Sequence, residues 1–218
     1  MHQPETEAFA RTWILWSVLL ALAVSLTLVI TFDGTRPEEH DLIQAVQKLP
    51  IGTLFPNLVR AATTTELDLI VGAGLAAGLW RTGDRKAMAV LILLLVALPL
   101  IQHGLKLLVD RPRPPFDLAD LWSDPAGPSF PSGHVMSATV VYGFLLFLSF
   151  REQWPPPYRV LAKTLSLAVL GLTALTSVYL EVHWPTDVLG GYLWGIVLLL
   201  PGISVLIRAP ATGGSPVG

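Results

Sequence analysis

The stretch TWILWSVLLALAVSLTLVIT, residues 12–31, contains no charged side chain. A helix of about 20 residues crosses the hydrocarbon core of a bilayer, so this stretch predicts a membrane-spanning helix. Glu5 and Glu7 precede it with one basic residue, Arg11, and the apolar run continues well past Ala23. We therefore expect a retained membrane helix rather than a cleaved signal peptide.

The composition of the whole chain supports a membrane protein. Of its 218 residues 52% are hydrophobic and only 14% are charged, with a mean hydropathy of +0.59. In a typical soluble domain about a quarter of the residues are charged. Five further apolar stretches follow the first, at 69–80, 87–101, 135–150, 160–180 and 188–207. We expect one all-α domain over residues 1–218, an integral membrane bundle of six transmembrane helices with a flexible tail at 209–218.

The short connections predict the orientation. Six spans place both termini on one side of the membrane, together with the connections at 81–86 and 151–159. Both connections are basic, and the positive-inside rule then assigns the termini to the cytoplasm. We therefore expect a multi-pass protein of the cell (inner) membrane whose remaining loops are extracytoplasmic. Residues 38–48 have helical apolar spacing and are interpreted as a short surface helix, either a lid or a plain connector.

Charge and cysteine content exclude several classes of function. A net charge of -2 leaves no basic footprint for nucleic acid. The absence of Cys excludes disulfides, thiolate metal sites and cysteine catalysis. Asp117, Asp120 and Asp124 lie in a Pro-rich loop without a partnering His, so we interpret them as solvated loop residues. No metal or other cofactor is expected.

The first polar cluster is KLLVDRPRP, residues 106–114. Lys106 and Arg113 can be the snorkelling end of a membrane helix. They can equally converge on a phosphate group, with Arg as a bidentate fork and Lys as a point charge. The cluster by itself leaves both interpretations open.

The second cluster is FPSGH, residues 130–134, directly before an apolar stretch. Ser132 suits an N-cap, and Gly133 allows a ligand to approach the backbone closely. The free N–H groups and the positive end of the helix dipole favour an anion there. His134, in the first turn, can donate a proton to a group that leaves the anion.

The third cluster is TSVYLEVHWPTDVLGG, residues 176–191. Pro185 suits the first position of a helix, so Asp187 falls in the first turn. Asp187 can accept a hydrogen bond from one nitrogen of His183, which leaves the other nitrogen as a basic nucleophile.

The three clusters emerge on the same side of the predicted membrane, so their polar side chains can meet. Ionisable groups at membrane depth are costly and are functional candidates by default. Two histidines with separate roles, a cationic cradle and no carboxylate cluster for a metal favour phosphoryl transfer through a covalent phosphohistidine.

The motifs K-x6-R-P, P-S-G-H and H-x3-D, in this order, resemble the signatures of the type 2 phosphatidic acid phosphatase superfamily, over about residues 100–191. The resemblance implies that phosphate is bound by Lys106, Arg113, Ser132 and the Gly133 amide. It further implies His183 as the nucleophile, His134 as the general acid and Asp187 as the group that orients His183. It implies no metal.

One position departs from the family pattern, in which the third motif reads S-R-x5-H-x3-D. Here Thr176 and Ser177 stand where the family has Ser and Arg. That Arg normally grips the phosphate, and Ser cannot supply its charge, so we expect weakened activity. We do not assign the role to Arg111, because R-P-R-P is ordinary in such proteins.

The sequence therefore predicts a membrane hydrolase that removes phosphate from a lipid phosphate or diphosphate at the outer leaflet. It resembles bacterial members that act on undecaprenyl diphosphate, phosphatidylglycerol phosphate or phosphatidate. The expected partners are the lipid substrate and membrane lipids, with the oligomeric state open. A lipid phosphotransferase, or a catalytically weak lipid-phosphate binding protein, remains as an alternative. Small-xxx-small pairs at Gly74/Gly78 and Gly191/Gly195 are expected to pack helices within one chain.

Overall fold

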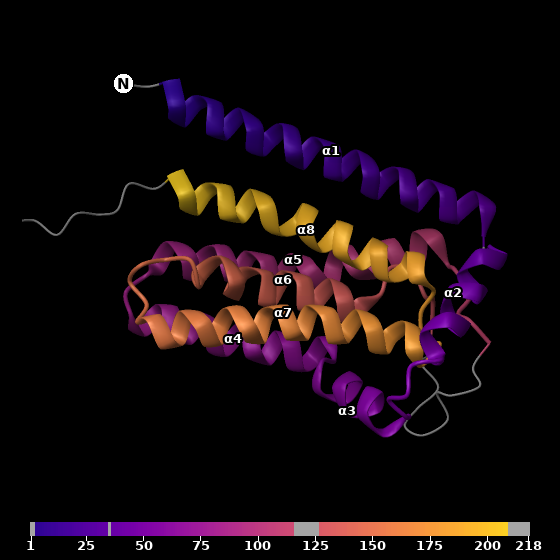
Figure 1. Cartoon of the computed structure of the whole chain (residues 1–218). Coiled ribbons are helices and arrows are strands. Elements are labelled where there is room, and N and C mark those ends of the chain that lie inside the picture. Colours follow the sequence, from indigo (N-terminus) through magenta and orange to yellow (C-terminus); the bar gives the residue numbers. More distant parts are fainter. Residues whose placement is uncertain (1–2, 35, 116–126, 209–218) are drawn as a thin grey trace, which may run out of the picture.

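The computed structural model describes residues 3–34, 36–115 and 127–208, and all regular secondary structure within these ranges is α-helical (Figure 1). The helices are α1 (Gln3–Asp33), α2 (Pro37–Gln47), α3 (Leu54–Ala62), α4 (Thr65–Arg81), α5 (Arg85–Val109), α6 (Gly133–Leu148), α7 (Pro156–Tyr179) and α8 (Pro185–Arg208). The predicted tail at 209–218 and the loop aspartates Asp117, Asp120 and Asp124 lie outside the described residues.

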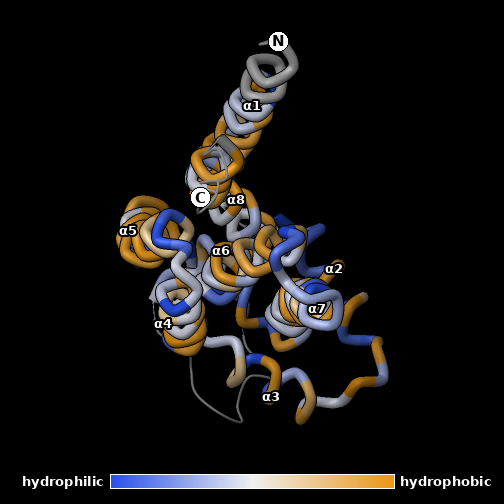
Figure 2. The backbone as a smooth tube through the Cα atoms, turned by 90° about the vertical axis from the view of Figure 1, so that its left-hand side faces the viewer, coloured by the Kyte–Doolittle hydropathy of each residue, from blue (hydrophilic) through white to orange (hydrophobic). Residues whose placement is uncertain are grey.

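Helix α6 is the centre of the bundle. It packs against α4, α5, α7 and α8, and α1 lies along the outer side of α8 (Figure 2). Met136, Val140, Phe144 and Leu148 recur every fourth residue on α6, and all four are buried in the main apolar core. This stripe at helical spacing fixes the face that α6 turns toward α4, α5 and α8.

Among the described residues, four helices are long and apolar enough to cross a membrane. They are α1 from Arg11 to Asp33, α5, α7, and α8 from Pro185 to Ile207, while α6 is a shorter apolar helix. The helix that contains the predicted stretch at 69–80 is longer than that stretch, because α4 begins at Thr65 and carries Glu66 and Asp68 in its first turn. The Thr64 hydroxyl caps this helix by accepting the N–H of Leu67.

Helix α5 extends beyond the predicted apolar stretch at 87–101. It continues to Val109, and Lys106 lies in its last turn, in agreement with a position at the end of a membrane helix. Helix α2 confirms the short surface helix predicted at 38–48. Helix α3 was not predicted; it has only 9 residues, and Pro56 in its first turn reads as a loop signal.

The two ends of the bundle carry different parts of the chain. The predicted basic connections, α4–α5 and α6–α7, lie at the same end as the start of α1 and the end of α8 (Figure 1). An ion pair between Arg151 and Asp84 joins these two connections. Helices α2 and α3 lie at the opposite end.

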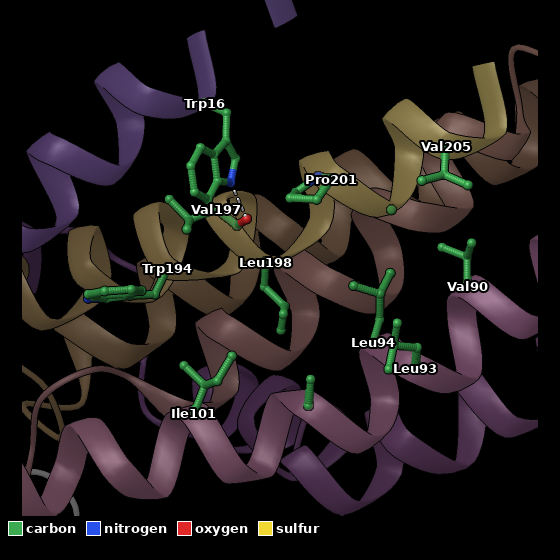
Figure 3. A pocket seen from close by; sticks show the side chains of 12 residues that line it. Trp16, Val90, Leu93, Leu94, Ile101, Trp194, Val197, Leu198, Pro201 and Val205 are labelled. Carbon is green, nitrogen blue, oxygen red and sulfur yellow. Dashed lines mark hydrogen bonds between the residues drawn. The ribbon is translucent and has the colours of Figure 1, made fainter. Parts of the chain in front are cut away.

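A tryptophan on α1 compensates for a proline inside α8. Pro201 has no N–H, so the carbonyl of Val197, four residues earlier, has no helical donor. The indole Nε1 of Trp16 donates to this carbonyl at 2.9 Å (Figure 3). The contact lies beside a cavity of about 590 Å³ between α1, α5 and α8 that apolar side chains line. Backbone groups must be satisfied within the protein at membrane depth, so this contact stabilises the α1–α8 pair.

Glycines on α8 allow it to approach α6 closely. A Cβ on Gly191 would lie 2.9 Å from the carbonyl oxygen of Ser132, and one on Gly195 would lie 2.7 Å from Thr139 Cβ. The predicted packing role of this pair within the chain is confirmed. A Cβ on Gly74 or Gly78 would meet no described atom within 4 Å, so that pair packs no helix within the described structure.

Candidate active site

The three predicted clusters meet at the end of the bundle that carries α2 and α3. The backbone N–H of Ser132 donates to the carbonyl of Asp187 at 3.0 Å, which joins the start of α6 to the first turn of α8. Arg113 Nη1 donates to the carbonyl of Val182 at 2.6 Å and lies 3.5 Å from Nε2 of His183. The segment after α5 therefore closes over the α7–α8 connection.

His183 is buried and presents its two nitrogens to different surroundings. Nε2 faces the Arg113 guanidinium, and Nδ1 lies 3.7 Å from Oδ2 of Asp187. Burial lowers the pKa of His183 to about 4, although the neighbouring Asp187 acts in the opposite direction. The imidazole is therefore neutral at neutral pH, which is the form that can act as a nucleophile.

Asp187 is held by groups other than His183. Its Oδ1 accepts from Arg111 Nη1 at 2.6 Å, and its Oδ2 accepts the backbone N–H of Trp184 at 2.9 Å. A separation of 3.7 Å from the imidazole exceeds a hydrogen bond. The hydrogen bond expected between Asp187 and His183 is thus not formed here.

Arg111 forms ion pairs with Asp187 and Glu39, which hold its guanidinium in a structural role. Its Nη2 donates to Oε2 of Glu39 at 2.5 Å, while its Nη1 also donates to the Thr186 hydroxyl at 2.8 Å. Glu39, on α2, additionally accepts from the Thr186 backbone and hydroxyl. The sequence analysis gave Arg111 and Glu39 no role, and no local pattern marks Glu39, because its partners are about 70 or more residues away.

Lys106 and Arg113 are positioned by backbone carbonyls. Lys106 Nζ donates to Pro128 at 2.5 Å, and Arg113 Nε donates to Gly127 at 3.0 Å. Both cations act electrostatically on His134 and on His183, so the four side chains share one site.

The residues at the start of α6 differ from expectation in two details. Ser132 occupies the N-cap position, but its hydroxyl caps nothing and has no hydrogen-bond partner within the described ranges. The space beside Gly133 is filled by Gln102, whose Nε2 would lie 2.4 Å from a Cβ at that position. The glycine is therefore needed for this contact, and the Ser132 hydroxyl is buried without a partner.

Ser177 contributes to the site through its backbone, whose carbonyl accepts the N–H of His183 at 3.3 Å. Its side chain is buried in α7, and its hydroxyl donates to the carbonyl of Thr173 at 2.6 Å. The position that carries Arg in the family pattern supplies neither a charge nor a free donor here. Within the described residues no three His, Asp or Glu side chains are grouped to hold a metal ion.

Comparisons with known proteins agree with the motif pattern. The chain is 29% identical to phosphatidylglycerophosphatase B of Bacillus subtilis over 187 residues, which are 84% of this chain and 88% of that protein. It is 38% identical over 73 residues to the "Putative undecaprenyl-diphosphatase YbjG" of Escherichia coli, or 33% of this chain and 32% of that protein.

The fold matches the crystal structure of a transmembrane PAP2 type phosphatidylglycerolphosphate phosphatase from Bacillus subtilis. The TM-score is 0.71 at 23% identity, over 91% of this chain and 98% of the other. This likeness and the apolar helices identify a multi-pass membrane protein. Residues 87–209 match the family described as the PAP2 superfamily, which confirms the resemblance seen in the motifs. The chain belongs to the PAP2 superfamily.

Proposed function

We propose that this chain hydrolyses a lipid phosphate through a phosphohistidine formed on His183. The observation that carries the proposal is the placement of His183 between a carboxylate and a cation. Asp187 lies on the Nδ1 side, and Arg113 lies on the Nε2 side. A neutral imidazole with Nε2 toward a cationic site is suited to attack a phosphorus atom whose oxygens those cations hold.

The reaction consists of two displacements at phosphorus. His183 Nε2 attacks, the P–N bond forms, and the bond from phosphorus to the lipid oxygen breaks. His134 donates a proton to that oxygen, and the lipid alcohol leaves. A water molecule, deprotonated by His134, then attacks the phosphohistidine, and inorganic phosphate leaves with the P–N electron pair returned to His183.

The phosphate is held by Lys106, Arg113, Ser132 and the Gly133 amide. The Ser132 hydroxyl has no partner within the described part of the chain, which supports a role toward a ligand. The N-terminus of α6 adds backbone N–H groups and the positive end of its dipole. Asp187 keeps the Nδ1 side of His183 negative, which stabilises the imidazole as it becomes positive during attack.

The bundle contains six spanning helices, α1 and α4 to α8, with the termini in the cytoplasm and the site at the extracytoplasmic surface of the inner membrane. The place of the basic connections, together with a general rule, supports this orientation. The basic connections lie at the end opposite the site, and the positive-inside rule favours the cytoplasm for that end. At the outer surface a lipid keeps its chains in the bilayer while its headgroup reaches His183.

We propose phosphatidylglycerol phosphate as the first substrate to test. The Bacillus subtilis relative that bears the name phosphatidylglycerophosphatase B matches most of both chains. The undecaprenyl-diphosphatase relative matches only about a third of each chain, so undecaprenyl diphosphate comes second.

A weak lipid-phosphate binding protein is the second candidate. The Ser177 hydroxyl is bound to the Thr173 carbonyl, so the family's third-motif position supplies no charge for the transition state. Removal of one such donor typically lowers the rate about 10²–10³-fold.

The purified protein in detergent should release phosphate from phosphatidylglycerol phosphate, undecaprenyl diphosphate and phosphatidate, measured with and without EDTA. We expect release that EDTA leaves unchanged and that is fastest with phosphatidylglycerol phosphate. Tight binding of all three lipids without any release would favour the binding protein, and strict dependence on a divalent ion would contradict the phosphohistidine chemistry.

A further inference from the structure

Arg60 lies at the edge of the site on the helix that was not predicted from the sequence. It occupies the last turn of α3, and α3 packs against α7, the helix that carries Ser177. Shortly after α3, the first residue of α4 is Thr65, whose Oγ1 would lie 3.5 Å from a Cβ on Gly133. The junction of α3 and α4 therefore flanks the start of α6, where the expected phosphate-binding amides lie.

The Arg60 guanidinium is half-buried, and no group in the described part of the chain pairs with it. It has no hydrogen bond or ion pair with any side chain or carbonyl in the described part of the chain. Burial lowers the pKa of Arg60 below its usual value, yet a guanidinium stays protonated in proteins. A partly buried cation that no protein group pairs is favourably placed to bind an anion from solution.

The charge of Arg60 acts electrostatically on His134, the expected general acid. Among the charged side chains that influence His134, Arg60 acts most strongly, ahead of His183 and Arg113. Lys106 and Arg113 lie at the end of α5 and after it, whereas the charge of Arg60 acts on His134 from α3. An anion beside His134 would thus be within the electrostatic influence of cations from two parts of the chain, α3 and the end of α5.

We propose that the Arg60 guanidinium binds the phosphate of the substrate and supplies, from α3, the positive charge that α7 lacks at Ser177. The two alternatives within the site are already committed. Arg111 is bound to Asp187 and Glu39, and the Ser177 hydroxyl is bound to the helix backbone. The inference rests on the proposed function in one respect, namely that the anion belongs to a lipid phosphate.

The test uses orthovanadate, a phosphate mimic, so that it does not depend on turnover. Affinity is measured for the full-length protein in detergent from the rise in unfolding temperature with orthovanadate concentration. We expect Arg60→Gln to weaken binding about 10- to 100-fold, as for loss of a hydrogen bond to a charged group. Arg60→Lys should keep part of the affinity. Arg36→Gln, an exposed arginine on the same end of the bundle, is the matched control and should bind normally.

A second arm moves the charge to α7. In the Arg60→Gln background, Ser177→Arg should restore orthovanadate affinity, and with it the phosphate release that Arg60→Gln lowers by about 10²–10³-fold. A merely structural role of Arg60 predicts no such rescue. Unfolding temperatures without ligand verify that each variant is folded, and Arg60→Lys replaces Arg60→Gln if the latter is not.

The outcomes separate the two proposals. Orthovanadate binding without phosphate release by the unmodified protein would contradict the proposed hydrolysis. The ratio of orthovanadate affinities between the unmodified protein and Arg60→Gln would still decide the role of Arg60. Equal affinity in folded Arg60→Gln, or no orthovanadate binding by the unmodified protein, would overturn the assignment of Arg60.

Discussion

Arg111 and Asp187 form a buried ion pair, with Nη1 2.6 Å from Oδ1 and side-chain exposures of 1% and 0%. The same guanidinium binds Glu39 on α2. The outer helix α2 is thereby connected through Arg111 to the carboxylate beside His183. The interpretations of α2 from the sequence were a lid or a connector, whereas its contacts show a structural clamp.

We expect Arg111→Met to be strongly destabilising. Removal of one partner of a buried ion pair leaves an uncompensated charge, and the cost is about 3–5 kcal/mol. Urea unfolding in detergent measures this loss. The exposed pair Arg36–Asp33 provides the control, since Arg36→Met should change stability by well under 1 kcal/mol. Equal effects of the two substitutions would contradict the clamp.

The pKa of His183, lowered to about 4, predicts the acid limb of the pH profile. The nucleophile must be neutral, so single-turnover phosphate transfer should persist at pH 5 and fall only near pH 4. An ordinary histidine would already lose activity near pH 6.5. An acid midpoint near pH 6.5 for this transfer in the unmodified protein would show that burial does not depress the pKa of His183.

The same shift has a consequence for stability. The unfolded chain binds the His183 proton near pH 6.5, but the folded chain binds it only near pH 4, so stability is full above pH 6.5 and declines as pH falls to about 4. In His183→Gln this part of the acid dependence should be absent. Unfolding temperatures at pH 7.5, 5.5 and 4.5 compare the two proteins; parallel curves would count against the shift.

The contact between Trp16 and the Val197 carbonyl should depend on Pro201. We expect Trp16→Phe to cost about 0.6–1 kcal/mol for the lost hydrogen bond, in addition to altered packing. In a Pro201→Ala background the alanine amide can donate to the same carbonyl, so Trp16→Phe should cost less. A double-mutant cycle of unfolding free energies measures the difference. Strict additivity would show that the indole does not replace the missing donor.

Orientation can be measured because the chain has no native Cys. Lys48→Cys, next to α2, should react with a membrane-impermeant thiol reagent added to intact cells. Gln153→Cys, in the α6–α7 connection, should react only after the membrane is opened. Both positions are exposed, so accessibility to the reagent is matched. Labelling of Gln153→Cys alone in intact cells would place the site in the cytoplasm.

The sequence predicted those parts of the fold and the site that have a local signal. Uncharged runs such as residues 12–31 predict membrane helices. Pro185 at the first position of a helix places Asp187 in the first turn, close to the preceding His183. The fold as an all-helical membrane bundle and the family are confirmed. The contacts of Glu39 and Arg60 depend on how α2 and α3 pack against distant helices, and no periodicity encodes that.

Local chemistry also limits what spacing can predict. The Asp187 carboxylate accepts from Arg111 through Oδ1 and from the Trp184 backbone through Oδ2. The H-x3-D spacing predicted that the carboxylate lies near the imidazole, and the two groups are 3.7 Å apart. The spacing did not predict that Arg111 and Trp184 donate to this carboxylate. Likewise, the motif identified Ser132 as a cap, whereas its hydroxyl is left without a partner in the described structure.

The central claim is the covalent phosphohistidine on His183, and a rapid-quench single turnover tests it most directly. The protein is mixed with phosphatidylglycerol phosphate labelled in its terminal phosphate, quenched in alkali and digested. The account predicts one transient labelled peptide, acid-labile and alkali-stable, that contains His183, persists longer in His134→Ala and is absent in His183→Gln. Phosphate release by His183→Gln at the rate of the unmodified protein, or release without any labelled peptide, would contradict it.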